Sequence, residues 1–216
     1  RGIFGKVEQE VLEGSTPDLK ILRISVEEKA TGEIVAGAGV GTEGTSFMIA
    51  VAENNWLGKG IKFVSQLNVS EEKISGNLSL NNPNYNYSGN SVFTSLNVSS
   101  LDAKATSGYE SSKTGFSLGT SFEQYENVFL TPSFDAIYED VEVTSSSSSA
   151  IKKMDGTFYN LDFGYGITWD RRNQAFQPTD GYVTKFSQTL PLIQDSSSIV
   201  NGFEASAYHA FSEDII

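Results

Sequence analysis

Cysteine is absent from this 216-residue sequence, and histidine occurs once, as His209. The lack of cysteine excludes a disulfide framework and thiolate metal sites, although it does not fix the compartment in which the protein resides. A lone histidine argues against a histidine-rich metal site and against a His-based catalytic triad confined to this chain. We therefore expect no metal, no cofactor and no enzymatic activity.

Long apolar runs are also missing, and no segment approaches the roughly 18 continuous apolar residues of a transmembrane helix. Basic residues are outnumbered by acidic ones, 15 to 27, so the formal net charge is -12. Nucleic-acid surfaces need clustered Lys and Arg, and we expect no nucleic-acid partner. The chain starts at Arg1 without a signal peptide and stops at "AFSEDII" without a tail, so we expect both ends to be cut from a longer protein.

Helical periodicity is scarce, and the segment 157–170, "TFYNLDFGYGITWD", shows the pattern that replaces it. Every second residue from Tyr159 to Trp169 is apolar or aromatic, and the residues between them are polar or glycine. Alternation at period 2 is typical of a β-strand whose two sides have different surroundings. We count ten such segments after residue 30. Apart from 157–170 and the glycine-rich 31–41, they cover 47–51, 61–69, 74–80, 92–98, 114–122, 128–138, 182–190 and 203–211.

The apolar rows of these segments contain no Asp, Glu, Lys or Arg. A soluble β-sandwich that buries one face would produce this pattern, and so would an outer-membrane barrel that turns one face to lipid. Segments of about 9–11 residues favour the barrel, because soluble strands average about 5–6. Polar rows rich in Ser, Asn and Gly, and connections that alternate in length, favour it too. The sequence thus predicts an all-β, antiparallel transmembrane barrel in which Leu161 and Phe163 face acyl chains and Asp162 faces lumen water.

Aromatic residues cluster beside the expected turns, as in the interfacial girdles of membrane proteins. We expect membrane-interface positions at Trp56, Tyr85, Tyr87, Tyr125, Tyr138, Tyr159 and Trp169.

Residues 1–30 differ from the rest, with two charged, alternating segments around the turn at 14–18. This pattern predicts a water-exposed β-hairpin with one buried face. It is too short to be a domain by itself.

Several stretches, in order, resemble the BamA family of outer-membrane β-barrel assembly factors, within a superfamily that also includes TamA and the two-partner secretion transporters. The segment 31–60, "TGEIVAGAGVGTEGTSFMIAVAENNWLGKG", resembles the start of the family's barrel. The segment 81–87, "NNPNYNY", resembles one of the family's turns. A strand-turn-strand unit resembles "GITWDRRNQAFQPTDG" at 166–181. Residues 1–32 look like the last hairpin of a POTRA domain running into the barrel.

The resemblance implies that residues 1–30 are the C-terminal hairpin of the last POTRA domain, and that residues 31–216 are the first ten of sixteen barrel strands. It implies a factor in the cell outer membrane, with the hairpin in the periplasm, that folds and inserts β-barrel proteins. Its partners would be unfolded outer-membrane protein clients, accessory assembly lipoproteins bound through POTRA domains, and the lipid bilayer. A polypeptide-secreting transporter of the same superfamily and a passive porin-like channel are the alternatives.

The first barrel segment is poor in bulky side chains, and glycine weakens a strand through lost packing and entropy. In the family this strand is the edge of a lateral gate that binds client strands. The implied client-binding residues are Glu33, Ile34, Val35, Ala36, Gly37, Ala38, Gly39, Val40 and Gly41. A bulge, or close contact with a loop inside the lumen, is the alternative reason for these glycines.

The cluster of Asp170, Arg171 and Arg172 favours a turn salt bridge and strand cap over a metal or phosphate clamp. The serine run at 145–149 predicts a flexible outer loop.

Overall fold

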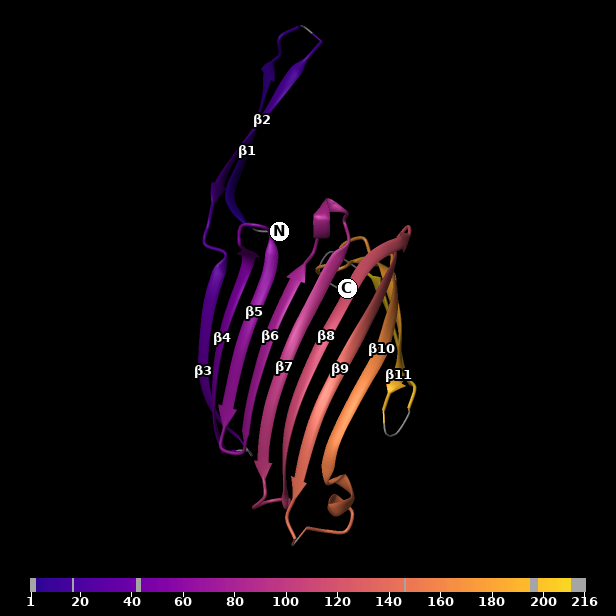
Figure 1. Cartoon of the computed structure of the whole chain (residues 1–216). Helices are drawn as coiled ribbons and strands as arrows, with labels where there is room; N and C mark the ends of the chain where they lie inside the picture. The colour runs from indigo at the N-terminus through magenta and orange to yellow at the C-terminus, as the bar shows by residue number, and fades with distance from the viewer. Residues whose placement is uncertain (1–2, 17, 42–43, 146, 195–197, 211–216) are drawn as a thin grey trace.

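The computed structural model describes residues 3–16, 18–41, 44–145, 147–194 and 198–210. A two-stranded hairpin precedes a ten-stranded antiparallel sheet in which each strand pairs with its neighbours in sequence (Figure 1). The predicted all-β fold with ten barrel strands after a hairpin is confirmed. The strands are β1 (Phe4–Glu13), β2 (Lys20–Glu28), β3 (Gly32–Gly41), β4 (Gly44–Trp56), β5 (Ile61–Ser70), β6 (Lys73–Asn82), β7 (Ser91–Ala103), β8 (Tyr109–Tyr125), β9 (Val128–Val143), β10 (Gly156–Asp170), β11 (Asp180–Ile193) and β12 (Val200–His209), with short 3-10 helices η1 (Tyr85–Tyr87) and η2 (Ile151–Met154).

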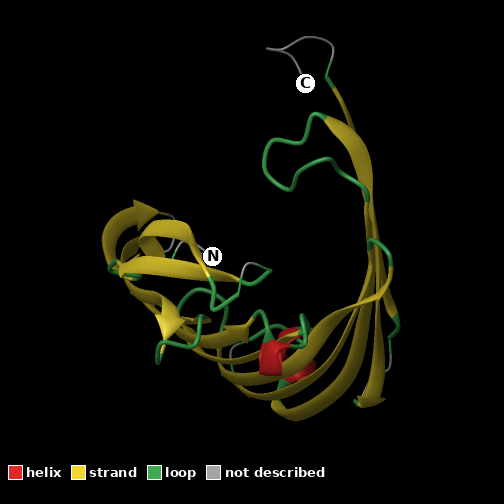
Figure 2. Cartoon of the chain, turned by 90° about the horizontal axis from the view of Figure 1, so that it is seen from above, coloured by secondary structure: helices red, strands yellow, loops and turns green. Residues whose placement is uncertain are grey.

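The ten-stranded sheet curls into an open trough, as the view from above shows (Figure 2). The inherent twist of adjacent strands, summed over ten strands, produces such curvature. β3 and β12 form the two edges of the trough. The sheet is therefore a length of barrel wall rather than a closed barrel.

This wall has no dry core. The chain exposes 15053 Å², whereas a soluble monomer of this mass would expose about 9,700 Å². Among the described residues only Ala103, Val141 and Val183 are buried hydrophobics. A soluble sandwich needs two sheets packed around a shared interior, and the single curved sheet shows that this alternative is wrong.

Cross-strand register joins the apolar rows of neighbouring strands into one continuous surface. One line of directly paired residues crosses nine strands without a charge, through Ile34, Val51, Ser65, Leu78, Leu96, Phe116, Ala136, Leu161 and Ile193. The alternate residues pair just as consistently, and Gln66, Asn77 and Asn97 lie side by side on the opposite surface. The predicted division of each strand into an apolar and a polar row therefore holds across the sheet.

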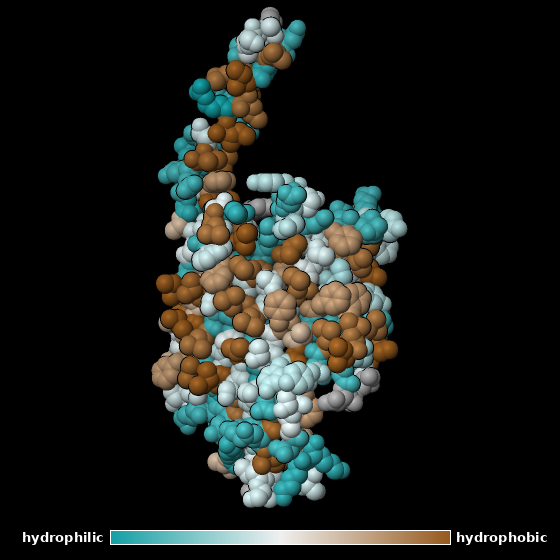
Figure 3. Space-filling view, in the orientation of Figure 1, coloured by the Kyte–Doolittle hydropathy of each residue, from teal (hydrophilic) through white to brown (hydrophobic). Residues whose placement is uncertain are grey.

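The apolar rows form the convex surface, here called the outer face, and the polar rows form the concave inner face. The outer face carries a hydrophobic band across its middle, with hydrophilic residues at both ends (Figure 3). Aromatic pairs border the band, with Tyr138 and Tyr159 at one border and Trp169 and Tyr182 at the other. Ten residues separate Tyr159 from Trp169 on β10, or about 34 Å along the strand, which a tilt of about 40° reduces to about 26 Å. This height matches the apolar band of outer-membrane barrels, about 25 Å.

The turns fall at two ends of the wall. The β4–β5, β6–β7, β8–β9 and β10–β11 turns share the end from which the β1–β2 hairpin projects, here called the hairpin end (Figure 1). The β5–β6, β7–β8, β9–β10 and β11–β12 connections lie at the opposite, or loop, end. Within the described residues no helix is long and apolar enough to cross a bilayer.

Two details differ from the sequence expectation. Six of the ten wall strands, β4 and β7 to β11, are longer than 9–11 residues, and β8 and β9 have 17 and 16. The connection that the predicted segments 92–98 and 114–122 leave between them, 99–113, therefore shrinks to 104–108. Glu53 also lies on the outer face, opposite Phe63. It is close to the hairpin end of β4, where it accepts hydrogen bonds from the Thr31 hydroxyl and the Asn55 N–H. This charge on the outer face therefore lies at the edge of the apolar band and not in its middle.

Candidate functional site

All nine residues predicted to bind client strands lie on β3, which forms one edge of the sheet. Within the described residues β3 pairs with β4 alone, and every residue from Gly32 to Gly41 is exposed. Such an edge presents unpaired backbone N–H and C=O groups to any further strand. The arrangement is chemically suited to binding another β-strand through its main chain.

The register between β3 and β4 runs without a shift from Gly32–Glu53 to Gly41–Gly44. The proposed bulge is therefore wrong for this strand. Because the register is regular, β3 has two clean rows. Ile34, Ala36, Ala38 and Val40 belong to the outer face, while Glu33, Val35, Gly37, Gly39 and Gly41 belong to the inner face.

The glycines of β3 are not required by their neighbours in the described chain. A Cβ added at Gly37 would lie 3.8 Å from Met48 Cε, and one at Gly39 would lie 3.6 Å from Ser46 Oγ. One at Gly41 would meet nothing within 4 Å. A Cβ therefore fits at all three positions among the described residues, so the glycines weaken the strand without relieving a clash there.

The predicted interface aromatics occupy both ends of the wall. Trp56 stacks on Phe63 with ring centroids 4.6 Å apart, and Trp169 meets Tyr182 edge-on at 5.1 Å, both toward the hairpin end. Tyr138 and Tyr159 pair at 5.1 Å toward the loop end. Tyr125 ends β8, and Tyr85 and Tyr87 lie on η1 in the β6–β7 turn. Sequence reasoning missed Phe63 and Tyr182 as ring partners, because only register shows which residue lies beside a tryptophan.

The inner face is a network of polar side chains. Asn77 donates to Asn97 Oδ1 at 2.7 Å, and Ser117 Oγ donates to Asp135 Oδ1 at 2.5 Å. Asp135 pairs directly with Asp162, which accepts a hydrogen bond from the Gln194 amide. No group of three or more His, Cys, Asp or Glu in the described part of the chain is arranged to hold a metal ion. This face is suited to contact with water and polar chains, as the prediction for Asp162 requires.

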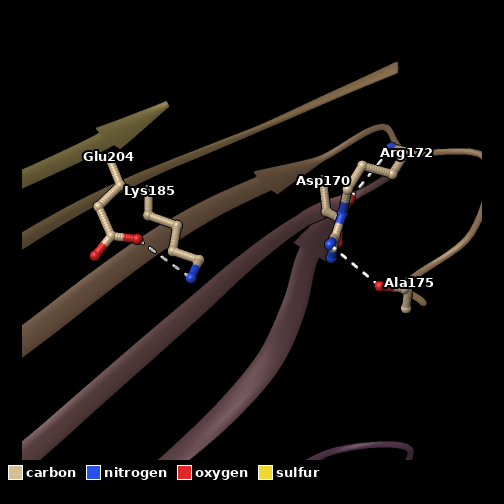
Figure 4. Close-up of polar contacts among 5 residues, drawn as sticks. All are labelled: Asp170, Arg172, Ala175, Lys185 and Glu204. Carbon is tan, nitrogen blue, oxygen red and sulfur yellow. Dashed lines mark hydrogen bonds and ion pairs between the residues drawn. The ribbon is translucent and has the colours of Figure 1, made fainter. Parts of the chain in front are cut away.

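Two ion pairs lie on the inner face near the hairpin end (Figure 4). Arg172 grips Asp170 with two bonds, Nε to Oδ1 at 2.8 Å and Nη2 to Oδ2 at 2.6 Å. The carboxylate raises the pKa of the Arg172 guanidinium above its usual value. Arg172 Nη1 also donates to the Ala175 carbonyl, which ties the turn back to the strand end. The predicted turn salt bridge is confirmed, and Lys185 and Glu204 form a second, more exposed pair at 3.4 Å.

Replacing Arg172 tests how much this clamp stabilises the β10–β11 turn. We expect Arg172→Ala to lower the free energy of unfolding of the complete barrel by about 1–2 kcal/mol, because a partly buried bidentate pair is lost. Arg172→Lys should restore less than half of that loss, since an ammonium lacks the planar fork. Arg171→Ala, which removes an exposed neighbour, should change stability by less than about 0.5 kcal/mol. Urea titrations followed by tryptophan fluorescence measure all three, and equal losses for the two alanine variants would contradict the prediction.

Comparisons with known proteins agree with this architecture. The family model described as "Omp85 superfamily domain" matches residues 55–216. Among solved structures, the crystal structure of BamA from Haemophilus ducreyi lacking POTRA domains 1-3 superposes with a TM-score of 0.73 at 20% sequence identity. The match covers 99% of this chain and 44% of that chain, so this chain spans less than half of the protein it resembles.

The structural likeness supports the fold, and the family match extends over most of the sequence. Together they identify the trough as a partial wall of an outer-membrane β-barrel with a BamA-like fold. The chain belongs to the Omp85 superfamily.

Proposed function

We propose that this chain is part of an outer-membrane protein assembly factor in which β3 lends its edge to a strand of an unfolded outer-membrane protein. The observation that carries the proposal is that β3 combines a regular register with three glycines that its described neighbours do not require. Membership of the Omp85 superfamily is consistent with a role in outer-membrane protein insertion.

The physics of recognition at β3 is that of β-augmentation. A client strand would form main-chain hydrogen bonds along the edge of β3. Because the side chains of β3 are small, they would not restrict which side chains the client strand carries. A barrel strand alternates apolar and polar residues with period 2. Its apolar row would continue the outer row of Ile34, Ala36 and Val40, since a shift by one residue would turn that row toward water. The edge therefore selects for alternation rather than for a particular sequence.

The β1–β2 hairpin is consistent with the end of a POTRA domain in the periplasm. It projects from the hairpin end of the wall, beside the start of β3 (Figure 1). One of its faces exposes Val7, Val11, Leu22, Ile24 and Val26, which the rest of such a domain would cover. Accessory assembly lipoproteins would bind through the POTRA domains, and the outer face of the wall would contact the lipid bilayer.

Disulfide crosslinking in the complete protein tests the role of β3. With Ile34→Cys or Val40→Cys, we expect crosslinks to cysteines placed in the last strand of a client, appearing at every second client position because directly opposed Cβ atoms lie about 4.5–5.5 Å apart.

Ile49→Cys is the matched control, because it lies on the same face of β4 but that strand already has neighbours on both sides. Absence of crosslinks from Ile34→Cys and Val40→Cys on the outer row, and from Val35→Cys on the inner row, would refute the proposal. Crosslinks instead to inner-face positions such as Asn97, from a polypeptide passing through the lumen, would support a secretion transporter.

A further inference from the structure

The turn between β10 and β11, residues 171–179, reaches over the concave side of the wall at the hairpin end. Figure 2 shows it as a loop beside the C-terminal end of the wall, bent toward the inside of the trough. Phe176, near the middle of this turn, is 79% exposed. Because the turn is directed away from the outer face, contact with lipid does not explain the exposed ring.

The backbone next to Phe176 adopts a conformation that its sequence disfavours. Gln177 has a φ of 48°, in the left-handed region that non-glycine residues rarely occupy. Pro178 follows it, and the residue before a proline favours an extended backbone. Two independent preferences are therefore overruled at one residue. Strain of this kind persists only where the surrounding structure holds it, and it gathers at functional sites.

Hydrogen bonds hold the chain on both sides of Phe176. The Gln174 amide Nε2 donates to the Gln177 carbonyl at 2.6 Å. On the other side, Arg172 Nη1 donates to the Ala175 carbonyl at 3.4 Å (Figure 4). The two residues that flank the ring in sequence are thus fixed by side chains of the same turn.

The base of the turn is fixed to the wall. Asn173 Oδ1 accepts the N–H groups of Thr179 and Asp180, at 3.1 and 3.3 Å. Gly181 has a φ of 99°, and an added Cβ there would collide with the Arg171 carbonyl. Glycine allows this close approach, which brings the two ends of the turn together. A side chain exposed on such a fixed backbone can bind a partner with little further loss of backbone entropy.

Backbone of this kind distinguishes the two ends of the wall. Among the described residues, the positive φ values at the loop end belong to Gly44, Gly108 and Gly156. The described non-glycine residues with positive φ all lie in the turns of the hairpin end, and they are Leu57, Asn86, Tyr87, Asn127 and Gln177. The strained turns therefore face the side on which the orientation proposed above places the periplasm.

The position and size of the turn indicate which partner it suits. A polypeptide that enters the lumen from the hairpin end passes beneath this turn. A folded partner needs an interface of roughly 1,000 Å² or more, and one ring bordered by the amides of Gln174 and Gln177 is far smaller. An extended chain needs much less, because it can be held by one side chain at a time while amide groups bind its main chain.

We propose that Phe176 contacts the client polypeptide at the entrance to the lumen, where its ring packs against apolar, and above all aromatic, side chains of an unfolded outer-membrane protein. The alternating sequence of such a protein offers an apolar side chain at every second residue, so successive residues can meet the ring in turn. The identity of the occupant rests on the proposed function, whereas the contact itself is separate from β3.

Photocrosslinking of the complete protein in lipid vesicles tests the proposal. p-Benzoylphenylalanine takes the place of Phe176, and the probe is a small outer-membrane protein that is unfolded in urea and added during assembly. We expect a covalent product with the probe. The same photoreactive residue in place of Met154, which is also exposed but lies at the loop end, should give only background.

Substitutions test whether the ring itself carries the contact. Phe176→Ala should raise the probe concentration that gives half-maximal insertion by about two- to tenfold, the effect of losing one aromatic contact. Phe176→Trp, which keeps an aromatic ring, should restore most of that loss. Gln174→Ala leaves the ring but releases the Gln177 carbonyl, so it should show a smaller loss of the same kind. Because Phe176 is exposed, all three variants should fold, and heat-modified migration on gels checks this.

The outcomes separate this contact from the role proposed for β3. Crosslinks from position 176 without disulfide crosslinks at β3 would support the contact and refute the role of β3. Crosslinks at β3 without any from position 176 would overturn the contact alone. Crosslinks from position 176 to an upstream domain of the same protein, or an unchanged probe requirement in Phe176→Ala, would also overturn it.

Discussion

Leu96→Arg is expected to destabilise the complete barrel by about 2–4 kcal/mol, the cost of a cationic side chain at mid-membrane. Leu96 lies in the middle of β7 on the outer face, between Leu78 and Phe116. The net stability of a typical domain is only about 5–15 kcal/mol. A single substitution would therefore consume a large fraction of it, and a urea titration of the barrel folded in lipid vesicles should show an earlier unfolding midpoint.

Ser95→Arg is the matched control, because Ser95 is the next residue on the same strand and belongs to the inner face. Its cross-strand partner is Ser117, which bonds Asp135, so an arginine here faces water with a carboxylate nearby. We expect a change below about 1 kcal/mol. Equal losses for the two variants would contradict the division of the wall into a lipid face and a water face.

The exclusion of charge from one side of each strand explains why the strands and the direction of their side chains were predictable from sequence. Charged side chains are excluded from one row of each strand, and alternation has a period of two, so a row such as Leu161, Phe163 and Tyr165 identifies both the strand and its outer face. Ten segments were counted, and ten strands form the sheet. Amino-acid composition alone could not have identified the strands or their outer face, because the overall chain is acidic and rich in polar residues.

Strand ends were harder to predict, for a physical reason. Beyond Tyr138 the residues Asp140 and Glu142 still occupy the outer row of β9, yet they lie above the membrane, where no apolar residue is required. The strands continue through backbone pairing alone, and the sequence there looks like a loop. The same holds for Ser99 and Ser112 in the segment expected to be a connection, which lie in β7 and β8.

A hollow on the outer face, lined by Phe116, Ala136, Leu161 and Ile193, escaped sequence reasoning because four strands, β8 to β11, form it together. Pro191, which has no N–H for a sheet ladder, was the one local sign of the irregularity on β11. Ala136 alone looks like any small residue in a strand. Only the register, which sets Ala136 beside Leu161 and Ile193, shows that the small residue and the bulge coincide.

The edge strand and the wall differ in how glycine is used. An added Cβ at Gly119 would lie 2.2 Å from the Phe93 ring and 2.9 Å from the Pro132 carbonyl oxygen. That glycine is needed for packing. Gly37, Gly39 and Gly41 have room for a Cβ among the described residues, which leaves two reasons for them: the weakness of β3 that we propose, and contact with a loop inside the lumen.

If the family's lateral gate applies here, with β3 pairing to the closing strand of the complete barrel, replacing all three β3 glycines with alanine is expected to keep that gate closed without harming the fold. Each Gly→Ala change in a strand stabilises it by about 0.5–1 kcal/mol, so the triple variant should favour the paired state of β3 by about 1.5–3 kcal/mol. That shift lowers the open population about ten- to a hundredfold, at about 1.4 kcal/mol per factor of ten. The rate of client insertion into vesicles by the complete protein should fall by a comparable factor.

Gly115→Ala with Gly166→Ala is the control pair, because a Cβ at these wall positions meets its nearest neighbours at 4.0 and 3.8 Å and so also has room. These changes stiffen β8 and β10 but leave the β3 edge as it is, and client insertion should keep its rate. Heat-modified migration on gels reports whether each variant forms a folded barrel. If the β3 triple variant folds and inserts clients at the normal rate, the weakness of β3 has no part in client capture, because the only property changed is the strength with which that strand stays paired.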